Sequence, residues 1–184
     1  MEEELKKIVS EKKFNIFFQP IISLSDGKVI GYEALTRGPE GSYFYNPEVL
    51  FEEAKKANLL WDLEMVTRIK AIETFNSFKS DRLLFLNVDP EIIKDEHFIR
   101  GTTKEVLQFY GINPSNLIFE ITEKTAIEDY KAFKNVIDHY KSQGYKIAID
   151  DVGAGYSGLS AIAQIKPYYV KIDMSLIKII LRRL

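Results

Sequence analysis

The fold prediction rests on residues 146–151, which read Lys146-Ile147-Ala148-Ile149-Asp150-Asp151 and join a short apolar run to two acids. An apolar run of this length, bounded by polar residues, is typical of a buried strand. Similar runs occur at residues 83–88 (LLFLNV), 117–121 (LIFEI) and 168–172 (YYVKI). Longer amphipathic segments separate these runs, so strand and helix alternate along the chain. This alternation predicts an α/β fold in which helices cover a parallel sheet.

The chain opens differently, with a predicted antiparallel hairpin. One strand is expected over residues 14–24 and the next over residues 29–35. The four residues between them, Ser25-Asp26-Gly27-Lys28, are a strong signal for a tight turn. The predicted sheet therefore has one antiparallel strand followed by parallel ones.

The helices are predicted from apolar spacing and from capping residues. Asn46-Pro47 supplies an N-cap and a first-turn proline, and Gly144 suits the position just after a helix. Helical segments are expected around residues 47–72, 92–98, 104–110, 126–143, 158–165 and from 175 onward. Periodicity alone does not separate a closed barrel from an open doubly wound sheet.

Composition bounds the class of protein. The chain has 184 residues, of which 46% are hydrophobic and 28% charged, which is an ordinary balance for one globular domain. The formal net charge of −2 gives no electrostatic reason to expect binding to duplex nucleic acid. The absence of cysteine excludes disulfides and thiolate-bound zinc. No apolar run approaches membrane-spanning length and no signal peptide is evident, so we expect a cytoplasmic protein.

Polar residues close five successive predicted strands. They are Glu33, Asn87, Glu120, Asp150 with Asp151, and Lys171 with Asp173. In a parallel barrel the carboxyl ends of the strands meet at one mouth, where such folds place their active sites. Taken singly, Asp151 or Asp173 reads more simply as the cap of a following helix. Five successive strand ends favour a functional cluster, because neighbouring carboxylates repel one another unless cations hold them together.

Oxygen ligands without histidine or cysteine suit hard cations, Mg²⁺ or Mn²⁺. Two such ions can activate water and stabilise the leaving oxygen of a phosphodiester. Lys171 would point at the same mouth, to orient water or neutralise a phosphate oxygen, or else to form a salt bridge with Asp150 or Glu120. The glycine-rich residues 153–158 (GAGYSG) resemble a phosphate loop, a weak signal strengthened by the acid pair that precedes them.

Several motifs together resemble the EAL domain family. They are Gln19-Pro20-Ile21, Glu33-Ala34-Leu35 within GYEALTRG, Phe85-Leu86-Asn87-Val88, Phe119-Glu120-Ile121-Thr122-Glu123, Ile149-Asp150-Asp151-Val152-Gly153-Ala154-Gly155-Tyr156-Ser157 and Val170-Lys171-Ile172-Asp173. They follow the family's order and spacing over nearly the whole chain. One departure is Val152, where the family usually has phenylalanine.

The resemblance implies a TIM-type barrel with one antiparallel strand and the hydrolysis of cyclic di-GMP to a linear dinucleotide. By similarity, the metal ligands would be Glu33, Asn87, Glu120, Asp150 and Asp151. Lys171 would contact the nucleophilic water, and Glu123 would hold the glycine loop, which places both in the catalytic set. The substrate-binding set would be Gln19, Leu35, Arg37 on a phosphate, and Asp173.

The resemblance also implies two further strands after residue 172, carrying a glutamate and a glutamine near the metals. We therefore expect a single domain over residues 1–184 that is an incomplete barrel, truncated after its sixth strand, with an incomplete metal site. Three interpretations follow: a two-metal phosphodiesterase, a cyclic di-GMP-binding or protein-interaction module without turnover, and an inactive fragment. Unpaired sheet edges and the nearly apolar last helix favour self-association, for instance as a homodimer.

Overall fold

The computed structural model describes residues 1–122, 130–153, 162–163 and 165–181. Its centre is one six-stranded sheet in the order of the sequence. The strands are β1 (Asn15–Ile22), β2 (Val29–Arg37), β3 (Leu83–Asn87), β4 (Leu117–Thr122), β5 (Lys146–Val152) and β6 (Tyr169–Ile172). β1 is antiparallel to β2, and every later neighbour is parallel. The predicted fold, a hairpin leading into a parallel α/β sheet of the barrel type, is confirmed.

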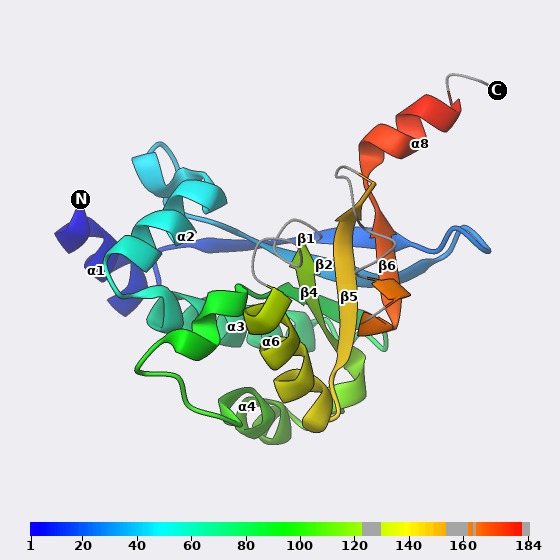
Figure 1. Cartoon of the computed structure of the whole chain (residues 1–184). Helices are drawn as coiled ribbons and strands as arrows, with labels where there is room; N and C mark the ends of the chain where they lie inside the picture. Colours follow the sequence, from blue (N-terminus) through cyan, green and yellow to red (C-terminus); the bar gives the residue numbers. More distant parts are fainter. Residues whose placement is uncertain (123–129, 154–161, 164, 182–184) are drawn as a thin grey trace.

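Six α-helices and three short 3-10 helices are assigned within the described residues. The α-helices are α1 (Glu2–Ser10), α2 (Pro47–Lys56), α3 (Leu60–Ser77), α4 (Thr102–Tyr110), α6 (Tyr130–Ser142) and α8 (Met174–Leu181). The 3-10 helices are η1 (Tyr43–Tyr45), η2 (Pro90–Lys94) and η3 (Pro114–Asn116). Figure 1 shows α3, α4 and α6 together on one side of the sheet, whereas α8 projects away from it. No helix in the described ranges is long and apolar enough to cross a membrane.

Local sequence signals explain several element boundaries. Asn46 caps α2 by accepting a hydrogen bond from the backbone N–H of Glu48 at 2.9 Å, with Pro47 in the first turn. Gly144, just after α6, has a φ of 88°, the left-handed conformation that glycine adopts without strain. In the hairpin turn, the N–H of Ser23 donates to the carbonyl of Lys28 at 2.8 Å. These three boundaries lie where the sequence predicts them.

Other elements differ from the prediction. α1 was not expected, although Leu5, Ile8 and Val9 recur at helical spacing and are buried. Where a helix is predicted over residues 92–98, the chain forms the 3-10 helix η2 from Pro90 to Lys94, which Asp89 caps by accepting from the N–H of Glu91. The helix predicted over 126–143 is present from Tyr130 to Ser142 as α6, and residues 126–129 lie outside the described residues. Most of the short helix expected over 158–165 lies outside the described residues.

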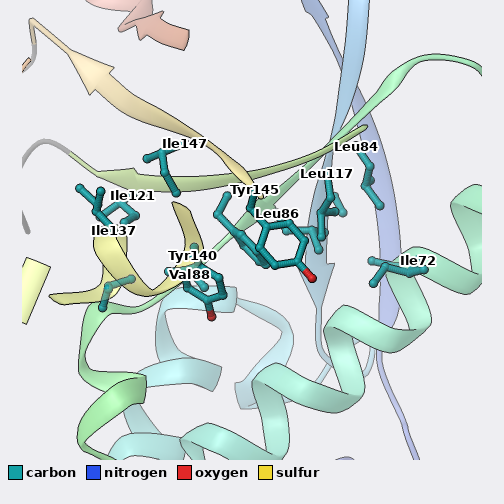
Figure 2. Close-up of a cluster of buried hydrophobic side chains, with 14 of the residues drawn as sticks. Ile72, Leu84, Leu86, Val88, Leu117, Ile121, Ile137, Tyr140, Tyr145 and Ile147 are labelled. Atoms are coloured by element: carbon teal, nitrogen blue, oxygen red, sulfur yellow. The ribbon is translucent and has the colours of Figure 1, made fainter. Parts of the chain in front are cut away.

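The sheet has two different faces. Alternate strand residues on the outer face, such as Leu86 and Phe119, pack against α3, α4 and α6 in the largest hydrophobic cluster. Figure 2 shows Leu84, Leu86 and Leu117 of the strands near Ile72 of α3. The inner face carries a smaller cluster, which comprises Phe85, Ile118 and Ala148 with Ile21, Ile30, Leu83 and Tyr169 packed against it. The candidate site is built directly above this second cluster.

Candidate active site

The inner face changes from apolar to polar within one repeat of the strand. Side chains two residues apart on a strand point to the same face. Phe85, Ile118, Ala148 and Tyr169 form the apolar layer, and two positions later come Asn87, Glu120, Asp150 and Lys171. Asn87 pairs directly with Glu120 in the β3–β4 register. Because the strands are parallel, the polar layer lies at their carboxyl ends, as the sequence predicts.

Three carboxylates meet in this polar layer. Glu33 on β2, Glu120 on β4 and Asp150 on β5 offer oxygen atoms that all lie within 4.8 Å of one another. Glu120 is completely buried and Glu33 is 9% exposed. Asn87 donates from Nδ2 to Glu33 Oε1 at 2.8 Å, so its amide oxygen is the atom that remains to bind a cation. Four of the five predicted metal-binding residues are thus brought together.

Lys171 lies between the three acids. Its Nζ is 2.8 Å from Glu33 Oε2, 3.0 Å from Glu120 Oε1 and 3.0 Å from Asp150 Oδ2. Salt bridges from Lys171 to Asp150 or Glu120 are one interpretation of the sequence. Both are present, and Glu33 is a third partner. The ammonium is close to Glu120 Oε1 but directs its hydrogen bond at Oε2, 3.1 Å away. The buried Glu120 Oε1 accepts no hydrogen bond within the described residues.

The charges of the cluster do not balance. Burial raises the pKa of Glu120 well above its ordinary value, and repulsion from Glu33 adds to this effect. Burial alone would lower the pKa of Lys171, but the surrounding carboxylates outweigh burial and raise it. One ammonium faces three carboxylates, and one buried carboxylate oxygen has no hydrogen bond. Oxygen donors with unbalanced negative charge are the environment that Mg²⁺ or Mn²⁺ prefers, so the residues present fit a divalent cation.

Asp151 lies apart from the cluster formed by Glu33, Glu120 and Asp150. Its side chain is exposed, its φ is 56°, and its N–H donates to Asp150 Oδ1 at 2.9 Å. The backbone turn at Asp151 thus fixes the neighbouring carboxylate. Partial burial, followed by repulsion from Asp150, raises the pKa of Asp151.

The residues assigned to substrate flank the acids on the same face. Gln19 pairs with Glu33 across β1 and β2 and is exposed. Leu35 and Arg37 follow Glu33 at two-residue intervals and are half-buried. Arg37 Nη1 donates to the carbonyl of Thr36 at 2.7 Å. A cavity of about 360 Å³ is lined by Leu35 and Arg37, and its lining also includes Asn87, Glu120, Phe51 of α2 and Glu64 of α3.

Asp173, assigned to substrate, follows the end of β6 and caps a helix. Asp173 Oδ1 accepts hydrogen bonds from the N–H of Ser175 at 2.8 Å and from the Ser175 hydroxyl, so it caps α8. These bonds hold the pKa of Asp173 below its ordinary value. Glu123 and most of the glycine-rich stretch lie outside the described residues, although Gly153 is described and has a φ of 100°.

Sequence reasoning missed two buried charged residues on the outer side of the sheet. Glu64 and Arg68 of α3 are 4% and 5% exposed and form an ion pair of 2.7 Å. Burial raises the pKa of Glu64 to about 7, against the opposing pull of Arg68. The available signal was their spacing of four residues among the apolar residues of α3.

Fold and site together define a barrel-type α/β domain with an acidic cluster at the carboxyl ends of its strands. The family model described as the EAL domain matches residues 2–183, and the chain belongs to this family. The family resemblance drawn from the motifs is therefore confirmed.

Individual relatives cover most of this chain. The "Probable cyclic di-GMP phosphodiesterase PdeB" of Escherichia coli (strain K12) is 27% identical over 178 residues, 94% of this chain and 34% of that protein. The chain thus spans about a third of the length of this curated relative.

Solved structures show the same fold. The structure titled "PaMucR Phosphodiesterase, c-di-GMP complex" has a TM-score of 0.78 at 24% identity, covering 96% of this chain and 73% of that chain. The "Klebsiella pneumoniae BlrP1 pH 6 manganese/cy-diGMP complex" has a TM-score of 0.77 at 27% identity, covering 91% of this chain and 42% of that chain.

Proposed function

We propose that this domain hydrolyses cyclic di-GMP to the linear dinucleotide with the help of Mg²⁺ or Mn²⁺. The convergence of Glu33, Glu120 and Asp150 within 4.8 Å carries the proposal. Similarity to known proteins supports it: a relative at 27% identity is named "Probable cyclic di-GMP phosphodiesterase", and a structure at 27% identity is titled as a manganese complex with this nucleotide. The fold itself supports only the location of a site.

The proposed roles follow from position. Glu33, Asn87, Glu120 and Asp150 would hold a divalent cation, with Asp151 available beside them. Bound cations would supply an activated water and stabilise the leaving oxygen of the phosphodiester.

The chain's other contributions are substrate placement and positive charge. Arg37 borders the cavity next to the acids, where its guanidinium would contact a phosphate, and Leu35 would pack against the nucleotide. Gln19, on the neighbouring strand, faces the same side as Glu33. The ammonium of Lys171 would orient the attacking water or offset the charge of the phosphate.

A second candidate is cyclic di-GMP binding without turnover. The observation that favours it is the position of Lys171, whose ammonium already bonds Glu33 and Glu120 and lies 3.0 Å from Asp150. A cation held there by the protein itself opposes entry of a divalent ion into the same cluster.

One experiment separates the two functions. The purified chain is incubated with cyclic di-GMP and Mn²⁺ or Mg²⁺, the products are separated by chromatography, and nucleotide binding is measured by calorimetry. The phosphodiesterase is supported if the parent converts the nucleotide, the Glu33→Gln variant does not, and the control variant Glu40→Gln, at an exposed position, still does. Nucleotide binding without conversion supports the binding module. In a separate Mn²⁺ titration, equal affinity of the parent and Asp150→Asn would contradict the metal assignment.

We also propose that the chain self-associates. Within the described residues β1 and β6 each have one neighbouring strand, and such edges recruit other strands. Large apolar side chains are exposed on or beside these edges, namely Phe17, Ile22, Tyr168, Val170 and Met174. Light scattering over a dilution series should show a mass that falls on dilution. A constant monomer mass with one cooperative unfolding transition would refute self-association. We expect association to leave the rate of hydrolysis unchanged.

A further inference from the structure

The buried pair Glu64–Arg68 lies outside the acid cluster, on the opposite face of the sheet. Arg68 Nη2 donates to Glu64 Oε2 at 2.7 Å, one helical turn along α3. Arg68 Nη1 also donates to Thr103 Oγ1 of α4 at 2.9 Å. The pair therefore joins two helices of the outer layer and is almost completely buried, although both residues line the cavity that Asn87 and Glu120 also line.

Both members of the pair reach a segment that carries a site residue. Glu64 Oε1 accepts a hydrogen bond from the backbone N–H of Asp89 at 2.8 Å, two residues after Asn87. The guanidinium of Arg68 lies over the ring of Phe119, 5.0 Å from its centroid. Phe119 directly precedes Glu120 on β4. Two of the residues that would hold a cation are thus contacted, through their neighbours, by one buried pair.

The segment that follows Asn87 is held from two further directions. The N–H of Val88 donates to the carbonyl of Glu120 at 3.0 Å, which joins this segment to β4. Asp89 Oδ2 pairs with Lys55 of α2 at 2.7 Å, where both side chains are about a quarter exposed. Of the two bonds made by side chains, the one from the Asp89 N–H ends on the buried Glu64, which is 4% exposed, whereas the salt bridge to Lys55 is partly open to water.

Stability alone is a weak explanation for such a pair. Replacing both members of a buried ion pair by apolar side chains of similar size is often neutral or stabilising, because desolvation offsets their attraction. A specific geometric role accounts for the pair better. Partners behind metal ligands orient those ligands, and their loss typically weakens metal binding about 10–100-fold.

We propose that Glu64, supported by Arg68, is a positioning residue that fixes the Asn87–Asp89 segment so that Asn87 and Glu120 together receive a divalent cation. This inference rests on the proposed metal site. The affinity of the site for a divalent cation would then depend also on Glu64 and Arg68, which lie on the outer face of the sheet and do not touch the cation.

Two double variants isolate the hydrogen-bond acceptor. Glu64→Met/Arg68→Met removes both charges and the acceptor for the Asp89 N–H. Glu64→Gln/Arg68→Met removes both charges but keeps an acceptor oxygen at the same place. Neither leaves a buried charge without a partner. Ile72→Val, at a buried apolar position one turn of α3 beyond Arg68, controls for loss of packing.

The measurements are Mn²⁺ affinity by calorimetry, Tm, and hydrogen exchange of the Asp89 amide by NMR. We expect the Met/Met variant to lose about 10–100-fold in Mn²⁺ affinity and to lose protection at the Asp89 amide. The Gln/Met variant should retain both, and Ile72→Val should lower Tm with Mn²⁺ affinity unchanged.

The outcomes are distinguishable. If the parent binds no Mn²⁺, the proposed metal function fails, and the positioning role fails with it. If the parent binds Mn²⁺ and the two double variants bind it equally, the positioning role is overturned while the metal site stands. If the Met/Met variant does not fold while Ile72→Val does, the pair is a folding element and the positioning role is overturned.

Discussion

Each face of the sheet buries carboxylates beside a positively charged side chain. Only on the outer face does the number of positive charges equal the number of carboxylates. On the outer face, one carboxylate, Glu64, meets one guanidinium, and each Glu64 oxygen accepts a hydrogen bond. On the inner face, the single ammonium of Lys171 meets three carboxylates, and Glu120 Oε1 accepts no hydrogen bond from any described residue.

This difference separates a structural charge cluster from a functional one. The pair of Glu64 with Arg68 carries no excess negative charge, whether or not Glu64 holds a proton, and both Glu64 oxygens are hydrogen-bonded. An excess of buried negative charge is costly unless the carboxylates take up protons or bind cations. The inner cluster is therefore the part of the molecule whose stability should respond to divalent ions, and the outer pair should not.

The largest effect is expected from Lys171→Met without divalent ions. The substitution leaves the carboxylates of Glu33, Glu120 and Asp150 with no ammonium among them, which should cost about 3 kcal/mol of unfolding free energy. Addition of Mn²⁺ should recover most of this loss, because the ion replaces the missing positive charge. Urea unfolding with and without Mn²⁺ measures both changes.

The control for this substitution is Lys28→Met, which removes an exposed lysine from the hairpin turn. It should change neither the unfolding free energy nor its response to Mn²⁺. A Lys171→Met protein as stable as the parent, or one that Mn²⁺ leaves unchanged, would show that the inner carboxylates do not depend on a cation.

Glu120→Gln should separate stability from ion binding. The amide keeps the shape of the side chain but removes one of the three negative charges, so the ion-free protein should gain about 1 kcal/mol. Mn²⁺ affinity should fall more than about tenfold, which corresponds to about 1.4 kcal/mol. Chemical unfolding and calorimetry on the same sample measure the two quantities.

Asp151→Asn is the matched control for Glu120→Gln, because Asp151 neighbours the cluster but is exposed. Its ion-free stability should stay within about 0.5 kcal/mol of the parent. A Glu120→Gln protein that is less stable than the parent would contradict the charge imbalance on the inner face.

The Glu64–Arg68 pair should contribute to the pH dependence of the unfolding free energy. The folded pKa of Glu64, about 7, lies above the ordinary value of 4.5. Between these values the folded state holds more protons than the unfolded state, so the unfolding free energy falls as pH rises through this window. The slope from one such group is at most about 1.4 kcal/mol per pH unit.

Glu64→Gln/Arg68→Met should lack this part of the slope, while the contribution of the inner carboxylates remains. Unfolding free energies of parent and variant from pH 4.5 to 7.5 give the difference directly. Parallel curves would mean that Glu64 stays ionised throughout, as a carboxylate whose attraction to Arg68 outweighs burial.

The two faces also differ in how far the sequence predicts them. The positions of Glu33, Asn87, Glu120 and Asp150 follow from strand periodicity and from the common direction of parallel strands, both of which are local rules. Asp173 stands at a strand end too, but its two hydrogen bonds with Ser175 make it a helix cap. The strand-end rule therefore locates Asn87, Glu120 and Asp150, whereas Glu33 lies in the middle of its strand because β2 continues to Arg37. A strand-end acid such as Asp173 can also cap a helix, and its assignment to substrate stays a prediction.

Glu64 and Arg68 could not be found in this way. A charged residue in a helix is ordinarily exposed, and its burial here depends on contacts with Asp89, Thr103 and Phe119 that are distant in sequence. α1 was missed for a related reason: its acidic first turn is typical of an exposed segment, and the burial of Leu5 depends on packing against Phe44 and Leu50, which are distant in sequence.

The smallest effect is expected at the pair of Lys55 with Asp89, whose side chains are each about a quarter exposed. Its 2.7 Å salt bridge holds the same segment as Glu64 does, but water reaches both side chains. Lys55→Met should therefore cost no more than about 1 kcal/mol of unfolding free energy, and Mn²⁺ affinity should change by less than about threefold, the equivalent of roughly 0.6 kcal/mol. Chemical unfolding and Mn²⁺ calorimetry are the measurements, with Lys56→Met, whose exposed lysine pairs with Glu53, as the control. An equal loss of Mn²⁺ affinity in Lys55→Met and in Glu64→Met/Arg68→Met would contradict this expectation. That result would show that the Lys55–Asp89 salt bridge, rather than the Glu64–Asp89 hydrogen bond, sets the position of Asn87. The distinction between the two faces would then rest on charge balance alone, with no role for the outer pair in ion binding.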